Sequence, residues 1–310
     1  MDEQLGLVFP GQGSQAVGML EELAADYPVV AETFTAAGEA LGQDLWSLVR
    51  NGPAEEINRT EVTQPVMLAA GVACWRAWRQ AGGAVPGRMA GHSLGEYTAL
   101  VCADAIGFED AVRLVRDRAR FMQEAVPEGQ GLMAAVMGLD DATVANCCQQ
   151  AAQGETVEPV NFNAPGQVVI AGNTAAVRRA LEAAREAGAK RAQELAVSVP
   201  SHCALMKPAA ERLADRLGEV SIGHPVVSVI HNTDAAISDD ANAIRQRLGR
   251  QLYTPVRWVE TIEAMKNGGV QRLIEAGPGK VLAGLNRRID RRMPIQPVFD
   301  RETLNTALEQ

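Results

Sequence analysis

The middle of the chain, from Gly131 to Ser198, constrains the fold most. Its apolar and amphipathic patterns predict six elements in turn: a strand at 131–139, a helix at 140–153, strands at 157–163 and 166–173, a helix at 174–188 and a strand at 191–198. This order, β-α-β-β-α-β, is that of a ferredoxin-like unit. Turn-forming sequences, PEGQG and SVPSH, flank it. We therefore expect a small ferredoxin-like subdomain at about 128–197, inserted into a larger unit.

The segments on either side of this insertion alternate between strand-like and helical patterns, which is typical of an α/β fold. The run LGLVF at 5–9 predicts a buried strand, and residues 63–83 predict a helix with Thr63 as its N-cap. The length of 310 residues allows one sizeable core together with the insertion. We expect residues 1–127 and 198–310 to form one large α/β unit.

Composition argues against several classes of protein. The net charge of −9 argues against a general nucleic-acid binder. No apolar run approaches the roughly 18 residues of a membrane span, and the N-terminus lacks the basic segment of a secretory signal. The five cysteines are odd in number and lack CxxC spacing, so neither a disulfide framework nor a zinc site is expected. We expect a cytoplasmic protein that binds neither nucleic acid nor membrane.

The stretch AGHSLGEYTAL at 90–100 places Ser93 in the pattern Gly-x-Ser-x-Gly. A strand-like run precedes it, and a helical run rich in small residues follows it. In that context the pattern can hold a reactive serine on a sharp strand-to-helix turn. Such a serine could pass an acyl group to water or to another acceptor. The alternative is a serine that merely caps a helix.

A serine nucleophile needs a base, and the chain has four histidines. His92 adjoins the serine, and neighbouring side chains on a tight turn usually point apart. His202 follows by about a hundred residues, and a base downstream of its serine is the chain order of α/β hydrolases. We choose His202, with a buried structural histidine as the alternative. No triad acid is evident, since nothing singles out Asp234 or Asp239.

The amphipathic pattern at 109–126 places Arg118 within the apolar stripe of a predicted helix. An inward guanidinium needs an anion, because an unpaired buried charge is strongly destabilising. The alternatives are a structural ion pair or a stem that reaches the surface. The functional interpretation is a bidentate site for a substrate carboxylate.

A glycine-rich loop, PGQGSQA at 10–16, follows the first predicted strand. It is a weak match to the dinucleotide-binding pattern, because the rest of that unit is missing behind it. The alternative is a loop beside Ser93 that donates backbone N–H groups to an oxyanion.

Taken together, these pieces resemble the malonyl-CoA:acyl carrier protein transacylase family over nearly the whole chain. The resemblance rests on FPGQGSQ at 9–15, GHSLGEY at 91–97, RARFMQEAVP at 118–127, PVNFNAPGQVVIAG at 159–172, VSVPSHCALMKPA at 197–209, QLYTPVRW at 251–258 and EAGPGKVL at 275–282. Ala119 is a departure, because the family usually has glycine there. The resemblance implies an α/β-hydrolase-like core with a ferredoxin-like insertion, in agreement with the order of predicted elements.

The resemblance also implies roles for particular residues. Ser93 would be the nucleophile that accepts the acyl group, and His202 would be its base. Arg118 would bind the malonyl carboxylate. Gln12 and the backbone N–H of Leu94 would form the oxyanion hole.

Gln251 is implied to orient the base through its backbone carbonyl, which would explain the missing acid. The implied reaction is ping-pong transfer of malonyl from malonyl-CoA to the phosphopantetheine thiol of acyl carrier protein, for fatty-acid elongation. The expected partners are that carrier and the coenzyme A thioester, with no cofactor or metal and with a monomeric enzyme. The alternatives are a serine hydrolase such as a thioesterase, an acyltransferase for a polyketide synthase, and a non-enzymatic scaffold that binds acyl carriers.

Five basic residues gather on a helix predicted within 279–292. They are Lys280, Arg287, Arg288, Arg291 and Arg292. A solvated helix face is the simpler interpretation. Because the carrier is usually acidic in this family's pathway, the alternative is a docking surface for that carrier.

Overall fold

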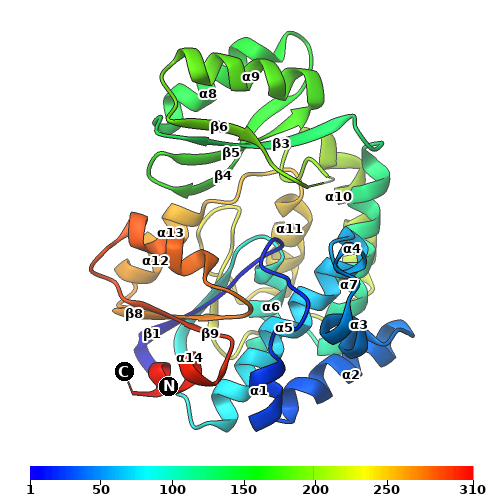
Figure 1. Cartoon of the computed structure of the whole chain (residues 1–310), viewed down its shortest axis with the longest axis vertical. Helices are drawn as coiled ribbons and strands as arrows, with labels where there is room; N and C mark the ends of the chain where they lie inside the picture. Colours follow the sequence, from blue (N-terminus) through cyan, green and yellow to red (C-terminus); the bar gives the residue numbers. More distant parts are fainter. Residues whose placement is uncertain (198, 310) are drawn as a thin grey trace.

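The computed structural model describes residues 1–197 and 199–309, and its larger sheet positions the serine. This sheet has five parallel strands in the order β7-β2-β1-β8-β9 (Figure 1). Its strands are β1 (Asp2–Phe9), β2 (Pro86–Gly91), β7 (Ser228–Ile230), β8 (Arg272–Ala276) and β9 (Ile295–Val298). Residue 198, where the predicted strand at 191–198 ends and the second part of the large unit begins, lies outside the described residues, as does residue 310.

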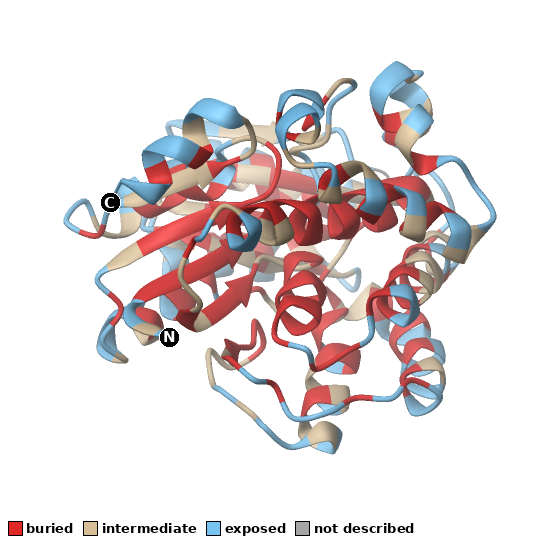
Figure 2. Cartoon of the chain, turned by 90° about the horizontal axis from the view of Figure 1, so that it is seen from below, coloured by how far each residue is buried: buried red, intermediate tan, exposed pale blue. Residues whose placement is uncertain are grey.

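Helices cover both faces of this sheet because successive strand side chains point to opposite sides. Leu5, Leu7 and Phe9 of β1 pack into the larger core, while Val8 packs into a smaller one. The larger core contains residues of α1 (Glu21–Asp26), α2 (Val29–Leu41), α3 (Leu45–Asn51), α4 (Ala54–Ile57), α5 (Thr60–Gln80), α6 (Gly95–Cys102), α7 (Phe108–Ala125), α10 (Lys207–Gly218), α11 (Ala241–Gln251) and α14 (Arg301–Leu308). The smaller core contains residues of α12 (Trp258–Asn267) and α13 (Val281–Ile289). Figure 2 shows the buried residues concentrated along the strands and the helix faces against them.

Several helix boundaries differ from the sequence prediction by a few residues, and two of these differences affect residues named above. Helix α5 begins at Thr60, so Thr63 lies inside it. The Thr63 hydroxyl donates to backbone carbonyls of the preceding turn, those of Ile57 (2.6 Å) and Arg59 (3.0 Å). Helix α13 runs from Val281 to Ile289, so Lys280 is its N-cap and Arg291 and Arg292 lie beyond its end.

The second sheet has four antiparallel strands in the order β4-β5-β3-β6. Its strands are β3 (Gly131–Met137), β4 (Val157–Ala164), β5 (Gln167–Asn173) and β6 (Arg191–Glu194), with β6 shorter than predicted. Helices α8 (Asp141–Ala152) and α9 (Thr174–Glu186) pack on one face. The predicted order of six elements is therefore present. The other face packs against Cys203, next to His202.

The two sheets are joined beside the serine. Val256, from the chain segment that follows α11, donates its N–H to the Val160 carbonyl (2.8 Å) and accepts from the Phe162 N–H (3.0 Å). The His92 ring donates from Nε2 to Asn163 Oδ1 (2.8 Å). Strand β4 is thus tied by both backbone and side-chain bonds to connecting segments of the larger unit.

The carboxyl ends of three neighbouring parallel strands carry the residues that matter below. Gln12 follows β1, Ser93 follows β2 and Asn232 follows β7. This edge is where ligands bind in open α/β sheets. Within the described residues, no helix is both long and apolar enough to cross a membrane.

Candidate active site

Ser93 lies on a tight turn between β2 and α6. Its φ of 52° is in the left-handed region, which residues other than glycine adopt only under constraint. The flanking glycines permit this turn. A Cβ on Gly91 would lie 1.8 Å from the Gly95 carbonyl carbon, and one on Gly95 would lie 2.2 Å from the Phe9 oxygen. The turn therefore has the predicted form, and both glycines are needed for steric reasons.

His202 forms a hydrogen bond with the serine, and a backbone carbonyl holds the ring. Its Nε2 lies 2.8 Å from Ser93 Oγ, and its Nδ1 lies 2.7 Å from the Gln251 carbonyl oxygen. Because a carbonyl only accepts, Nδ1 carries the proton and Nε2 accepts from the serine hydroxyl. Asp234 pairs instead with Arg247 (2.9 Å). The carbonyl occupies the position of a triad acid.

Burial lowers the pKa of His202 to about 3, the Arg118 cation acts in the same direction, and the bond to the Gln251 carbonyl opposes both. The imidazole is therefore neutral near pH 7. A neutral ring is the form that can take the serine proton.

Arg118, on α7, is 2% exposed. Nη1 donates to Gln64 Oε1 (2.8 Å), while Nη2 donates to Gln251 Oε1 (3.1 Å) and Ser93 Oγ (3.3 Å). Its guanidinium also lies 5.4 Å from the Tyr97 ring centroid. In the part of the chain that the structure describes, Arg118 forms no salt bridge. Both alternatives, the structural ion pair and the surface-reaching stem, are therefore wrong.

Five of the six predicted site residues line one cavity of about 150 Å³: Gln12, Ser93, Leu94, Arg118 and His202. Apolar side chains from α7 and β3, Met122 and Met133, line it too. The sixth residue, Gln251, is fully buried behind the cavity at the end of α11. The fold thus brings together residues from five distant segments of the chain.

The backbone around the serine leaves one N–H group available at the turn. The Ser93 N–H donates to Asn232 Oδ1 (2.7 Å). Among the described residues, the Leu94 N–H has no hydrogen-bond partner, and Leu94 lines the cavity. The Gln12 loop packs tightly here, since a Cβ on Gly11 would lie 2.7 Å from the His92 oxygen. Leu94 and Gln12 therefore flank the same space.

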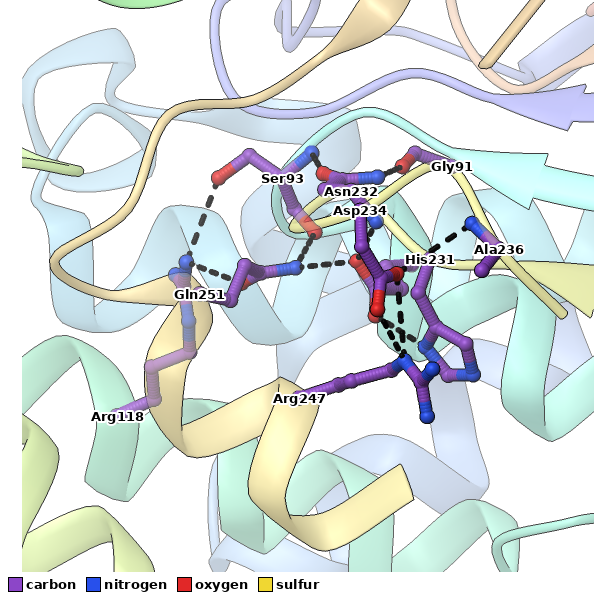
Figure 3. A network of polar contacts seen from close by, with 10 residues as sticks. Gly91, Ser93, Arg118, His231, Asn232, Asp234, Ala236, Arg247 and Gln251 are labelled. Atoms are coloured by element: carbon purple, nitrogen blue, oxygen red, sulfur yellow. Dashed lines mark hydrogen bonds and ion pairs between the residues drawn. The ribbon is translucent and has the colours of Figure 1, made fainter. Parts of the chain in front are cut away.

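Several buried polar residues near the site were not predicted from the sequence, and three of them form one network: Glu96, His231 and Asn232. Figure 3 labels the last two. Their bonds join segments about 135 residues apart. The available signal was an acidic residue in the first turn of a helix otherwise made of apolar and small residues. This pattern did not indicate which residues the Glu96 carboxylate would contact.

Sequence similarity to known proteins shows which family the chain belongs to. Residues 7–295 match the acyl transferase domain family. The chain is 57% identical, over 99% of both sequences, to the malonyl CoA-acyl carrier protein transacylase of Salmonella typhimurium. The chain belongs to the malonyl CoA-acyl carrier protein transacylase family. The resemblance predicted from the sequence motifs is thereby confirmed.

Solved structures of transacylases have the same fold. An acyl carrier protein S-malonyltransferase from Vibrio cholerae is 55% identical with a TM-score of 0.96, over 98% of this chain and 99% of that one. A malonyl-transacylase in complex with a type II polyketide synthase acyl-carrier protein is 55% identical with a TM-score of 0.98, over 99% of each chain. Among the described residues of this transacylase-family chain, no group of three or more His, Cys, Asp or Glu is placed to hold a metal ion.

Proposed function

We propose that this chain transfers a malonyl group from malonyl-CoA to the phosphopantetheine thiol of an acyl carrier protein, through a malonyl-serine at Ser93. One observation carries the proposal: a buried arginine that forms no salt bridge within residues 1–197 and 199–309 shares a cavity with a serine that is bonded to a neutral histidine. A serine–histidine pair supports acyl transfer in general. The unpaired Arg118 guanidinium supports the proposal that the transferred acyl group carries a negative charge of its own.

In the first half-reaction, His202 Nε2 takes the Ser93 proton while Oγ forms a bond to the thioester carbonyl carbon. The oxyanion is stabilised by the Leu94 N–H and by Gln12, and loss of one such donor typically costs about 3 kcal/mol. Gln251 holds the ring through its carbonyl. The carbon–sulfur bond then breaks, and the proton passes from His202 to the departing CoA sulfur. The second half-reaction reverses these steps, with the carrier thiol as the attacking group.

Arg118 is proposed to select the acyl group. A malonyl carboxylate can replace the long 3.3 Å contact from Nη2 to Ser93 Oγ, which frees the hydroxyl as the substrate binds. An acetyl group offers no such acceptor and leaves the cation unpaired. Sites that depend on a buried polar contact can discriminate by about 10⁴-fold.

The finer description of the fold is part of the same proposal. We assign residues 1–127 and 198–310 to an α/β-hydrolase-like subdomain and residues 128–197 to a ferredoxin-like one. The strand–turn–helix at Ser93 supports the first assignment, and the strand order β4-β5-β3-β6 supports the second. We further propose a monomer in the cytoplasm that acts in fatty-acid elongation, without cofactor or metal.

The test is the intact mass of the protein after brief mixing with malonyl-CoA, with Ser93→Ala as the control. We expect a gain of one malonyl group on the wild type only, and its loss when holo acyl carrier protein is added. Continuous release of CoA without carrier and without a stable adduct would instead identify water as the acceptor, as in a thioesterase. The absence of both adduct and turnover would support a scaffold.

A second candidate is supply of a polyketide synthase. It is favoured by one comparison, because the relative that was solved with its carrier protein serves a type II polyketide carrier. The chemistry at Ser93 would be the same, and only the cognate carrier would differ. Discharge of malonyl-Ser93 by fatty-acid and polyketide carriers in parallel separates the two.

The basic residues of helix α13 lie next to basic residues of the smaller sheet. Arg288 on α13 donates to Gln167 Oε1 of β5 (2.8 Å). Lys190 and Arg191, at the start of β6, line one surface hollow together with Arg288. Both parts of the molecule thus contribute cations to one surface. This supports the docking of an acidic carrier rather than an ordinary solvated helix face.

Reversing the charge of Arg287 and Arg288, as Arg287→Glu with Arg288→Glu, is expected to raise the KM for the carrier about tenfold, because complementary charges are replaced by repulsion. The KM for malonyl-CoA should stay unchanged. The matched control reverses two exposed arginines of α7, Arg113 and Arg120. Steady-state kinetics with each substrate varied in turn would measure this, and an unchanged carrier KM would exclude the docking role.

A further inference from the structure

Glu96 is a fully buried carboxylate that has no part in the mechanism above. It lies in the first turn of α6, three residues after Ser93. His231 Nδ1 donates to Oε1 (2.7 Å), while the Asn232 N–H (3.0 Å) and Gln251 Nε2 (2.8 Å) donate to Oε2. In the described part of the chain it pairs with no arginine or lysine. A buried carboxylate is costly unless its bonds are satisfied, so this network needs an explanation.

One branch of the network determines how Gln251 faces Arg118. Gln251 Nε2 donates to Glu96 Oε2 and to the Ser93 carbonyl (3.0 Å). A flipped amide would place its oxygen against these two acceptors, so Glu96 and the Ser93 carbonyl together fix the orientation. The amide oxygen consequently points at Arg118 Nη2, 3.1 Å away (Figure 3). Without Glu96, the Gln251 side chain loses the shorter of the two hydrogen bonds that fix this arrangement and keeps only the bond to the Ser93 carbonyl.

The other branch stabilises the serine turn. Asn232 receives its fixed position from the bond of its N–H to Glu96. Its side chain accepts from the Ser93 N–H (2.7 Å) and donates to the Gly91 carbonyl (2.7 Å). Asn232 therefore bridges the two sides of a turn whose central residue has a left-handed backbone.

The spacing of the charges has a functional consequence. The Glu96 carboxylate is separated from the Arg118 guanidinium by a single amide, that of Gln251. A direct ion pair would occupy the donors that a substrate carboxylate needs. The amide instead orients the guanidinium with a neutral acceptor that holds less strongly than a carboxylate would.

We propose that Glu96 is a positioning residue that acts through the Gln251 amide to hold Arg118 ready for the substrate carboxylate, and so helps to set the preference for malonyl over acetyl. This inference rests on the proposed function. The readout is the ratio of kcat/KM for acylation of Ser93 by malonyl-CoA and by acetyl-CoA. This ratio does not depend on the fraction of folded enzyme, so a merely structural role would leave it unchanged.

The variants are Glu96→Ala, Glu96→Gln and Gln251→Met. Glu96→Ala and Gln251→Met should each lower the malonyl-to-acetyl ratio at least about tenfold, because a small misplacement of a binding group has a large kinetic effect. Glu96→Gln keeps an acceptor for Gln251 and Asn232 and should retain most of the preference. Gln251→Met keeps the backbone carbonyl that His202 uses, so it carries the test if Glu96→Ala does not fold.

The matched control is Glu275→Ala. Glu275 is also fully buried and accepts from two backbone N–H groups, those of Leu282 and Ala283, but it has no bond to the arginine network. Its loss should reduce stability and leave the ratio unchanged. A wild-type ratio retained in Glu96→Ala, or in Gln251→Met if Glu96→Ala does not fold, would overturn the inference alone. A wild type that does not prefer malonyl would overturn the proposed function and the inference with it.

Discussion

Replacing His202 with alanine is expected to slow acylation of Ser93 on the order of 10⁴-fold, the upper range for loss of a general base. Among the described residues, the two other histidines near the site are engaged elsewhere and are not placed to replace it. His231 is bonded to Glu96, and His92 donates to Asn163. A neutral fluorophosphonate, which needs the activated hydroxyl but not Arg118, measures the labelling rate of Ser93 directly. His224→Ala, at an exposed histidine, is the matched control.

The same reagent tests the state of the base in the wild type. The pKa of His202 is lowered to about 3, so its neutral, proton-accepting form persists as the pH falls. Labelling should therefore stay constant from about pH 8 to about pH 5. A histidine with an ordinary pKa near 6.5 would instead be half protonated at about pH 6.5, and the labelling rate would decrease as the pH falls below that value. A midpoint near pH 6.5 would contradict the assigned environment of His202.

Replacing Arg118 with alanine is expected to lower malonyl transfer at least about 100-fold and to narrow the preference for malonyl over acetyl. The variant removes the cation that the substrate carboxylate would meet, while acetyl-CoA loses no partner. Arg113→Ala is the control, because Arg113 lies on the same helix in an exposed pair with Asp110. Acylation rates with both thioesters measure the effect. A preference that survives in Arg118→Ala would mean that another group binds the carboxylate.

Local patterns predicted the parts of this site that depend on local structure. The Gly-x-Ser-x-Gly spacing predicted the turn at Ser93, because the glycines solve a steric problem within five residues. The helical stripe predicted that Arg118 faces inward, because that depends only on periodicity. The order of strand-like and helical patterns likewise predicted an α/β unit with a second, inserted unit that has a sheet of its own. The prediction that Thr63 caps helix α5 was wrong. It assumed that Pro65 lies in the first turn, whereas the helix begins at Thr60.

The parts that could not be predicted depend on long-range contacts. Gln251 came from the family resemblance and not from its own surroundings, since a backbone carbonyl has no sequence signature. Glu96 meets His231 and Asn232 only when β7 lies next to β2 in the sheet. The buried network is a property of strand order, which a single sequence does not specify.

The central place of β1 in the sheet has a consequence for how the enzyme is made. β1 precedes the other strands of this sheet in the chain, yet one of its two partners, β8, begins at Arg272. The base also lacks its orienting carbonyl until Gln251 has been synthesised. Catalytic competence therefore requires that distant segments, including Gln251 and β8, have been synthesised and folded.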